Sequence, residues 1–323
     1  MIGVTLGTDL DHEPGRVLID LTRKIERLGY ESVWLTDVFG REPFSTAAWL
    51  LAKTERIRVG TSIANVYGRD ADTAAQTRRT LGELAEGRFI LGIGVSAKVI
   101  NDLRGAASVS PLTKMTAYLD RLHTAPIFSS EGTAPIYVGA HGPELQRLAR
   151  EKADGILTWV MPPAHTAAAR ARLGHKPAIS AQLPVVLHAD AAMARSVARN
   201  YLKTWLTVPS YQHAWSACGF GGGDFTDGGS DRLLDALVAW GDPSAIATRV
   251  QDYGKAGATR VIIQPLRKSE GARPRTVKGE TLVDGDWGAL EMLAPLLIGE
   301  SCTKTRMKYR IAEDAITQTG EER

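Results

Sequence analysis

The stretch from Arg58 to Gly94 constrains the fold more than any other part of the chain. An apolar run begins at Val59 and ends at Ile63, where turn-forming polar residues interrupt it. Asp70 to Ala85 carries apolar side chains at helical spacing, and Phe89 to Gly94 is a second apolar run. A strand, a crossover helix and a second strand form the unit of a parallel sheet. Ligands bind such sheets at the carboxyl ends of the strands, where the polar turn lies.

The same alternation of strand and helix continues along the chain. Strands are expected at Ile2–Leu6, Ser32–Thr36, Arg58–Ile63, Phe89–Gly94, Pro135–Gly139, Gly155–Trp159, Gln182–His188 and Arg260–Gln264. Helices are expected at Leu18–Leu28, Pro43–Ala52, Asp70–Ala85, Leu112–Leu122, Pro143–Ala153, Pro162–Leu173, Ala191–Leu206, Arg232–Ala239, Ser244–Ala256 and Trp287–Leu297. Eight strands that alternate with helices predict an α/β fold, the closed (β/α)8 TIM barrel.

A doubly wound sheet that binds a dinucleotide is the competing fold. Gly92 and Gly94 have the spacing that opens its glycine fingerprint, but the third glycine is absent from the residues that follow. Gly221 to Gly223 lack the Lys-Ser/Thr pair of a phosphate-binding loop. These glycines therefore fit a barrel strand and a flexible loop better than a nucleotide site.

The length of 323 residues suits one such barrel, and 44% hydrophobic residues supply a large core. We expect residues 1–300 to form one domain. Residues 301–323 are polar and lack an apolar stripe, so we expect a disordered tail. The segment from Arg267 to Asp286 is also polar and is expected to be a surface loop.

Composition also limits the kinds of binding partner and the cellular compartment that we expect for this protein. A scattered net charge of +3 does not indicate nucleic acid or a membrane surface as a partner. No segment has the roughly 20 apolar residues of a membrane span, and no signal peptide is visible. Cys218 and Cys302 imply no disulfide framework, and no His, Cys or Asp cluster has metal-ligand spacing. The cytoplasm is the expected compartment.

Several short motifs together resemble one family. They are Thr61-Ser62-Ile63, Asn65, Arg69, Glu83, Gly87-Arg88-Phe89 and Leu91-Gly92-Ile93-Gly94. In this combination the chain resembles the luciferase-like monooxygenase superfamily, and within it the oxidoreductases that use the deazaflavin coenzyme F420. The resemblance extends from Ile2 to about Leu297. It implies a barrel of the bacterial-luciferase type.

The resemblance also implies an activity. It is the transfer of a hydride between C5 of F420 and a small organic substrate, by an enzyme that forms a homodimer. Relatives commonly pair through helices near the second and third strands, where Trp49, Leu50 and Leu51 are expected to give an apolar surface. An FMN-dependent monooxygenase of the same superfamily is one alternative. A coenzyme-binding barrel without catalytic turnover is the other.

The resemblance places the coenzyme ring at the mouth of the barrel, the end where the carboxyl ends of the strands lie. Asp37, at the end of the second strand, is expected beside the ring and is a candidate catalytic residue. Capping of the following helix or pairing with an arginine is its alternative role. The Ser62-Ile63 peptide is expected to be cis, so that Ile63 supports the back of the ring. Asn65 and Ser96 are expected to contact the coenzyme.

The loop Gly139-Ala140-His141-Gly142 joins the fifth strand to a helix that starts with a proline. Its glycines and the helix dipole suit a phosphate group, and the resemblance implies that it holds the coenzyme phosphate. His141 is expected to contact the phosphate or solvent, with general acid catalysis as a second role. A plain turn is the alternative interpretation of this loop.

Two histidines that relatives carry near the ring are missing from this chain. Val38 and Ala97 stand at those positions, so the proton donor is not identified. His123, His165 and His175 lie on predicted helices or at their ends and are expected at the surface. Trp205, Tyr211 and Trp215 flank the glycine-rich segment and are expected in the core or an interface, with an active-site lid as an alternative.

Overall fold

Eight parallel strands close into a ring in the computed structural model, which describes residues 1–106, 109–128, 132–267 and 285–299. The ring runs through β1 (Ile2–Leu6), β2 (Ser32–Leu35), β3 (Arg58–Thr61), β5 (Phe89–Gly94), β6 (Ile136–Gly139), β7 (Gly155–Trp159), β8 (Ala178–Leu187) and β10 (Arg260–Pro265). It closes because β10 pairs with both β8 and β1. The predicted (β/α)8 barrel is confirmed.

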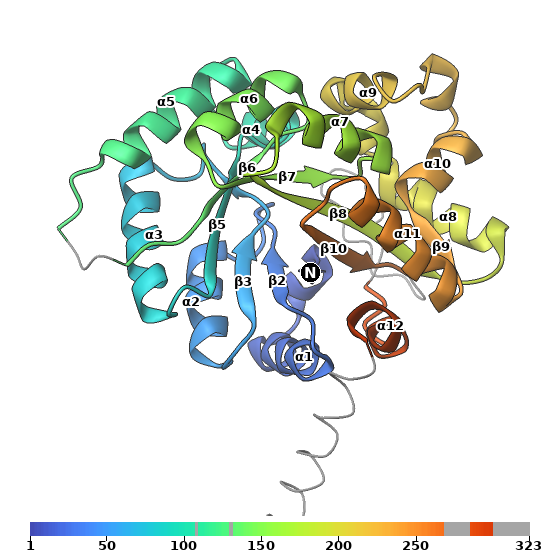
Figure 1. Cartoon of the computed structure of the whole chain (residues 1–323), viewed down its shortest axis with the longest axis horizontal. Helices are drawn as coiled ribbons and strands as arrows, with labels where there is room; N and C mark the ends of the chain where they lie inside the picture. The colour runs from blue at the N-terminus through green and yellow to red at the C-terminus, as the bar shows by residue number, and fades with distance from the viewer. Residues whose placement is uncertain (107–108, 129–131, 268–284, 300–323) are drawn as a thin grey trace, which may run out of the picture.

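Helices surround this ring on the outside (Figure 1). They are α1 (Gly15–Leu28), α2 (Pro43–Ala52), α3 (Ala71–Leu84), α5 (Pro111–Thr124), α6 (Pro143–Lys152), α7 (Pro163–Leu173), α8 (Ala191–Leu202), α10 (Asp231–Leu237), α11 (Pro243–Lys255) and α12 (Ala289–Ile298). Local chemistry sets several ends. The carboxylates of Asp70, Asp190 and Asp242 accept hydrogen bonds from first-turn amides of α3, α8 and α11. Gly29, with φ of 96°, ends α1.

Some short elements were not expected. Two small strands, β4 (Ala64–Asn65) and β9 (Ala239–Gly241), extend the sheet beside β5 and β8. The others are the helices α4 (Lys98–Leu103) and α9 (Pro209–Ser216) and the 3-10 turns η1 (Thr8–His12), η2 (Trp205–Thr207) and η3 (Gly222–Asp224). Such elements are too short to produce a periodic pattern. The helix expected to end at Leu206 ends at Leu202, and the one expected to reach Ala239 ends at Leu237.

Two expectations concern segments outside the described residues. They are the polar tail at 301–323 and most of the surface loop expected at 267–286. The assignment of residues 1–300 to one domain stays a prediction.

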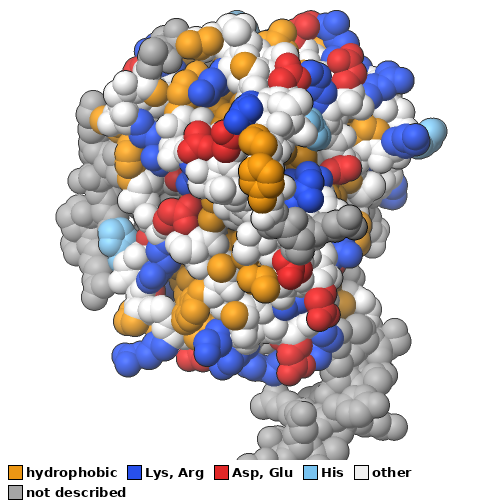
Figure 2. All heavy atoms as spheres, turned by 90° about the vertical axis from the view of Figure 1, so that its left-hand side faces the viewer, with side chains coloured by type: hydrophobic (Ala, Val, Ile, Leu, Met, Phe, Trp, Pro, Cys, Tyr) orange, Lys and Arg blue, Asp and Glu red, His pale blue; other side chains and the backbone are white. Residues whose placement is uncertain are grey.

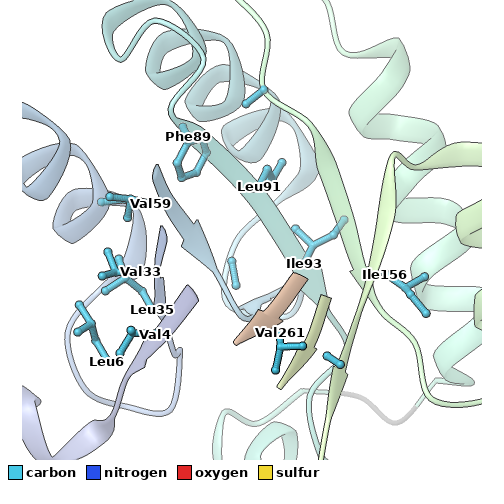
Figure 3. Packing of buried hydrophobic residues seen from close by; sticks show 14 of the residues in the cluster. Val4, Leu6, Val33, Leu35, Val59, Phe89, Leu91, Ile93, Ile156 and Val261 are labelled. Carbon is cyan, nitrogen blue, oxygen red and sulfur yellow. The ribbon is translucent and has the colours of Figure 1, made fainter. Parts of the chain in front are cut away.

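Alternate residues of each strand face the helices and the barrel interior. Figure 3 shows the helix-facing set, in which Val4, Val33, Val59 and Leu91 point away from the strands into one hydrophobic cluster. The intervening residues form a second cluster inside the ring, made of Trp34, Ile90, Tyr137, Leu157 and Ile262. The interior is therefore filled by side chains and is not a pore.

Trp34 fits inside the barrel because neighbouring strands carry glycine. A Cβ atom on Gly60 would lie 2.5 Å from the Trp34 ring, and one on Gly3 would lie 2.8 Å from Trp34 Nε1. The indole Nε1 donates a hydrogen bond of 2.9 Å to Ser32 Oγ. The large side chain is thus both accommodated and held in one orientation.

A charged residue lies at the amino-terminal end of the same interior. Arg260, only 1% exposed, donates from Nε and Nη2 to the two carboxylate oxygens of Glu31, each at 2.8 Å. Its Nη1 donates to Ser180 Oγ at 3.1 Å, and the guanidinium lies 5.3 Å from the centre of the Trp34 ring. Burial acts to raise the pKa of Glu31, but the hydrogen bonds and charge of Arg260, together with Ser32 and the charge of Arg58, outweigh it and lower that pKa.

The Glu31→Gln variant should lower the free energy of unfolding by about 3 kcal/mol, because it leaves a buried guanidinium without its counter-charge. Urea denaturation of the wild type and variant measures this loss. Glu55→Gln is the matched control, since Glu55 pairs with Arg56 at 3.6 Å on the surface and its loss should not change the midpoint. Equal midpoints for Glu31→Gln and wild type would contradict the role given to the buried pair.

Candidate active site

An apolar side chain lies on the rim formed by the carboxyl ends of the strands. The Ser62-Ile63 peptide bond is cis, as expected. A Cβ atom on Gly94 would lie 2.7 Å from Ile63 Cγ1, and one on Gly139 would lie 3.3 Å from Ile63 Cγ2. Glycines at the ends of β5 and β6 therefore make room for Ile63, which stays partly exposed at the mouth.

The hydroxyl of Ser62 points into the barrel, below Ile63. Its Oγ accepts a hydrogen bond from Gln182 Nε2, and Gln182 Oε1 accepts one of 3.3 Å from Thr5 Oγ1. All three side chains are buried. This chain of polar contacts joins β3, β8 and β1 across the interior, so it supports the Ile63 bulge from below.

Asp37 is held by two arginines and one backbone amide. Its Oδ2 accepts from Arg69 Nη1 at 2.8 Å and from the Asn65 N–H at 2.9 Å, while Oδ1 accepts from Arg104 Nη2 at 2.9 Å. The side chain is only 7% exposed. Of the roles considered for Asp37, pairing with arginine is the one that the structure shows. A direct catalytic role stays a prediction.

Asn65 and Ser96 flank the same rim. The Asn65 side chain donates to Asn101 Oδ1 at 3.0 Å and accepts from the Tyr67 N–H at 2.9 Å, so its polar atoms are engaged within the protein. Ser96 is partly exposed and has a φ of 57°, which is uncommon for a residue other than glycine. Contacts of either residue with a coenzyme stay predictions.

The loop Gly139–Gly142 leads directly into α6. Gly142 has an ordinary backbone conformation, with φ of −86°, and no side chain caps the first turn of this ten-residue helix. No atom lies within 4 Å of a Cβ placed on Gly142. The carbonyl oxygens of Ala140 and His141 both accept from Gln146 Nε2, at 3.4 and 3.1 Å. The loop is therefore fixed, and open space adjoins the helix start.

The His141 ring contacts protein groups. Its Nε2 accepts a hydrogen bond of 3.1 Å from the backbone N–H of Trp159, and its ring lies 4.7 Å from the Tyr211 ring between centroids. Burial, together with the charge of nearby His165, lowers the pKa of His141 to about 3. At neutral pH this imidazole carries no extra proton to donate, which argues against general acid catalysis. The geometry makes it an anchor for the Trp159 backbone.

The expectation that His165 lies at the surface was wrong. It is 5% exposed, and its Nε2 lies 2.8 Å from the His141 carbonyl oxygen, to which it donates. Pro162 and Pro163 start α7 so close to the end of β7 that its first turn packs over the loop after β6. His123 and His175 are exposed, as expected. Tyr211 and Trp215 are buried in a core cluster, as expected, and Trp205 packs against it.

Three residues at the mouth were not predicted as site residues, because in the sequence they resemble ordinary residues of a strand end or a helix. Trp159 ends β7, Gln264 lies near the end of β10, and Tyr201 lies on α8. Trp159 and Gln264 each follow, two residues later, a side chain of the interior cluster, Leu157 and Ile262. That period of two was the available signal, since it directs both side chains into the mouth.

Groups of three or more His, Cys, Asp or Glu residues placed to hold a metal ion are absent from the part of the chain that the structure describes. Within the same residues, no helix is both long enough and apolar enough to cross a bilayer.

The closed (β/α)8 barrel is the fold of the luciferase-like family. The luciferase-like monooxygenase family model matches residues 2–260, so the chain belongs to this family. A 5,10-methylenetetrahydromethanopterin reductase of Methanolobus tindarius is 27% identical over 282 residues, which cover 73% of this chain and 86% of the reductase.

Two further comparisons bear on the fold and the family. An F420-dependent glucose-6-phosphate dehydrogenase of Intrasporangium calvum is 31% identical over 179 residues, and the match spans 44% of this chain but only about half, 53%, of that protein. The structure of the coenzyme F420-dependent tetrahydromethanopterin reductase of Methanopyrus kandleri superposes with a TM-score of 0.63 at 19% identity, covering 92% of this chain and 98% of the reductase. This similarity shows the shared fold.

Acid should destabilise the protein partly through His141. The folded state holds its pKa near 3, below the ordinary value of 6.5, so the unfolded chain binds more protons between these values. The contribution of neutral, buried His141 to the free energy of unfolding is complete above about pH 6.5 and is lost as the pH falls towards about 3. The His141→Gln variant keeps a hydrogen-bond acceptor but has no imidazole to titrate. As the pH falls, its free energy of unfolding should decrease less steeply than that of wild type, by up to about 1.4 kcal/mol per pH unit.

Urea midpoints at several pH values between about 4 and 7.5 measure the two slopes. His123→Gln is the control, because His123 is exposed and its removal should leave the pH dependence unchanged. Parallel pH profiles for wild type and His141→Gln would show that His141 titrates normally in the folded protein.

Proposed function

We propose that this protein is an F420-dependent oxidoreductase, which transfers a hydride between C5 of the deazaflavin and a small organic substrate. The observation that carries the proposal is the Ile63 surface, on the same rim as the uncapped start of α6. Membership of the luciferase-like family supports it. So do the relatives above, one of which is named as an F420-dependent dehydrogenase.

The residues at the mouth fit the two ends of this coenzyme. A flat aromatic ring needs an apolar support, which the exposed part of Ile63 offers between Gly94 and Gly139. A phosphate needs backbone amides and room, which the loop Gly139–Gly142 and the amino terminus of α6 offer. Ala140 is fully buried and its N–H donates to the Leu157 carbonyl oxygen at 3.0 Å, so the proposed phosphate contact falls on the amides that follow it, at the start of α6. We propose that Asp37, Ser62, Asn65 and Ser96 shape the space between these ends.

When bound, F420 would donate or accept the hydride at its C5 carbon. The protein residues provide placement and shielding. Ile63 covers one face of the ring position, which leaves the opposite face for the substrate. The two arginines fix Asp37, and Asp37 fixes the Asn65 amide, so the turn after Ile63 is held in one conformation. An acceptor carbon would thus meet the ring on one side only.

We also propose that the protein is a homodimer that acts in the cytoplasm. The apolar dimer surface expected from Trp49, Leu50 and Leu51 needs correction. Leu50 and Leu51 are buried against the barrel, at 0% and 4% exposure, and only Trp49 is partly exposed. On the face that includes α2, α3 and α5, Figure 2 shows hydrophobic side chains in small groups among charged ones. Light scattering at micromolar concentration should give twice the chain mass of 34.9 kDa, and a monomer mass would contradict the dimer.

Calorimetric titration should show tighter binding of F420 than of FMN. The Gly142→Val variant should bind F420 roughly tenfold or more weakly, because the new side chain fills the space beside the uncapped amides of α6. Gly221→Val is the matched control, since Gly221 also has open space around its Cβ position and an ordinary φ of −118°. Circular dichroism checks that both variants fold.

Three results would contradict this proposal or part of it. Unchanged F420 affinity in folded Gly142→Val would remove the phosphate from this loop. Binding of FMN without binding of F420 would favour the FMN-dependent monooxygenase. Tight F420 binding without hydride transfer across a broad panel of acceptors would favour the non-catalytic barrel.

A further inference from the structure

Three polar side chains that have no assigned role meet on the side of the mouth formed by β7, β8 and β10. The Tyr201 hydroxyl donates a hydrogen bond of 2.7 Å to Gln264 Oε1. Trp159 is the register partner of Gln182, whose side chain reaches Ser62 inside the barrel. Neighbouring residues of parallel strands point the same way, so the indole faces the space beside the Ile63 bulge. Trp159, Tyr201 and Gln264 are all partly exposed.

The indole N–H of Trp159 is an unused donor. Its Nε1 atom is buried and makes no hydrogen bond to any residue that the structure describes. The Trp159 indole also acts on the Tyr201 hydroxyl, where it partly offsets the burial that raises the pKa of Tyr201 well above its ordinary value. A buried donor without a partner costs stability unless a ligand uses it.

The backbone around Trp159 is clamped at three consecutive residues. The Trp159 N–H donates to His141, the Val160 carbonyl accepts from Trp215 Nε1 at 2.8 Å, and the Met161 carbonyl accepts from the Tyr253 hydroxyl at 2.7 Å. Val160 has a φ of 45°, a rare conformation for a β-branched residue. Such conformations persist where the surroundings enforce them, often beside a functional group. The clamp holds the indole in a fixed direction.

The surroundings indicate what kind of ligand part lies beside these donors. Aromatic side chains line this side, with the Trp159 and Trp205 ring centres 6.2 Å apart and those of Trp205 and Tyr211 5.1 Å apart. Neither Trp159 nor Tyr201 carries a charge. Neutral donors in an apolar wall suit a neutral acceptor oxygen on an apolar body better than an anion.

We propose that Trp159 Nε1–H and the Tyr201 hydroxyl form the subsite that binds the substrate oxygen, and that the substrate is a ketone, an aldehyde or the corresponding alcohol with an apolar body. The inference deepens the proposed function and rests on it. Both groups donate hydrogen bonds to one oxygen, for which the Tyr201 hydroxyl turns away from Gln264. Gln264 is a positioning residue that holds the hydroxyl at the mouth before the substrate arrives. No proton transfer is assigned to either group.

The test uses the indole signals of the full-length, ¹⁵N-labelled protein, with cyclohexanone as the probe, with and without F420. The Trp159→Phe variant identifies the Trp159 indole signal by its loss. Cyclohexanone should move this signal downfield in a saturable way, because the N–H gains an acceptor. Tyr201→Phe should weaken the binding of cyclohexanone roughly fivefold to tenfold, the scale of one hydrogen bond.

Tyr30→Phe is the matched control, because the Tyr30 hydroxyl donates to the Leu290 carbonyl oxygen away from the aromatic side of the mouth, and the affinity of this variant for cyclohexanone should match wild type. The remaining indole signals report whether each variant is folded. If Tyr201→Phe does not fold, the shift of the Trp159 signal in wild type decides alone.

Three results would overturn the inference. They are an unmoved Trp159 signal at the solubility limit of cyclohexanone, movement of other indole signals only, or equal affinity in folded Tyr201→Phe and wild type. Separate titration with F420 distinguishes this failure from failure of the proposed function. F420 binding with an unmoved Trp159 signal would remove only the subsite, while a moved signal without F420 binding would remove only the coenzyme assignment.

Discussion

The barrel depends on a guanidinium group buried in its interior. Arg260 lies on the last strand and pairs with Glu31, which directly precedes β2, and with Ser180 on β8. A buried charge is tolerated only with a well-placed partner. The pairing therefore requires β10 to lie between β8 and the β1–β2 pair, which is the arrangement that closes the ring. The ion pair specifies the seam through geometry, whereas hydrophobic packing alone accepts many arrangements.

The side chains inside the barrel form layers, which begin at this ion pair and end at the mouth. Trp34 covers the guanidinium, and Gly3 and Gly60 leave room for it. The polar chain from Thr5 through Gln182 to Ser62 comes next, and Ile63 rests on the rim. A ligand platform on a loop is only as precise as the layer that supports it. Here the support consists of buried side chains from three strands, so the position of Ile63 follows from the packing of the whole interior.

Sequence patterns predicted the frame of this structure well. The bounds of β1, β5 and β7 agree with the expected ones, because each is an apolar run between polar or turn-forming residues. The bounds of α2 also agree, since Glu42 and Pro43 mark its start. The cis peptide followed only from the resemblance to a family, because no local pattern encodes it.

Contacts between distant segments were beyond such patterns. The pairing of Asp37 with Arg104 joins residues 67 positions apart, and His165 is buried by a loop 24 positions away. Leu50 and Leu51 show the same limit, because helical spacing alone did not reveal that both face the barrel. The Trp159, Tyr201 and Gln264 group comes from three elements and has no local signature. Its members come together only when the ring closes.

The two sides of the mouth differ in what their polar atoms do. On the β2–β4 side, Asp37 is saturated by Arg69, Arg104 and a backbone amide, and Asn65 is saturated by its neighbours. A protonated histidine at position 38 or 97 would add positive charge near these two arginines, whereas Val38 and Ala97 add none. The β7–β8–β10 side instead keeps a buried indole N–H without a partner and a neutral hydroxyl. Recognition of a substrate oxygen therefore belongs to the aromatic side, while the charged side serves to hold the rim in place.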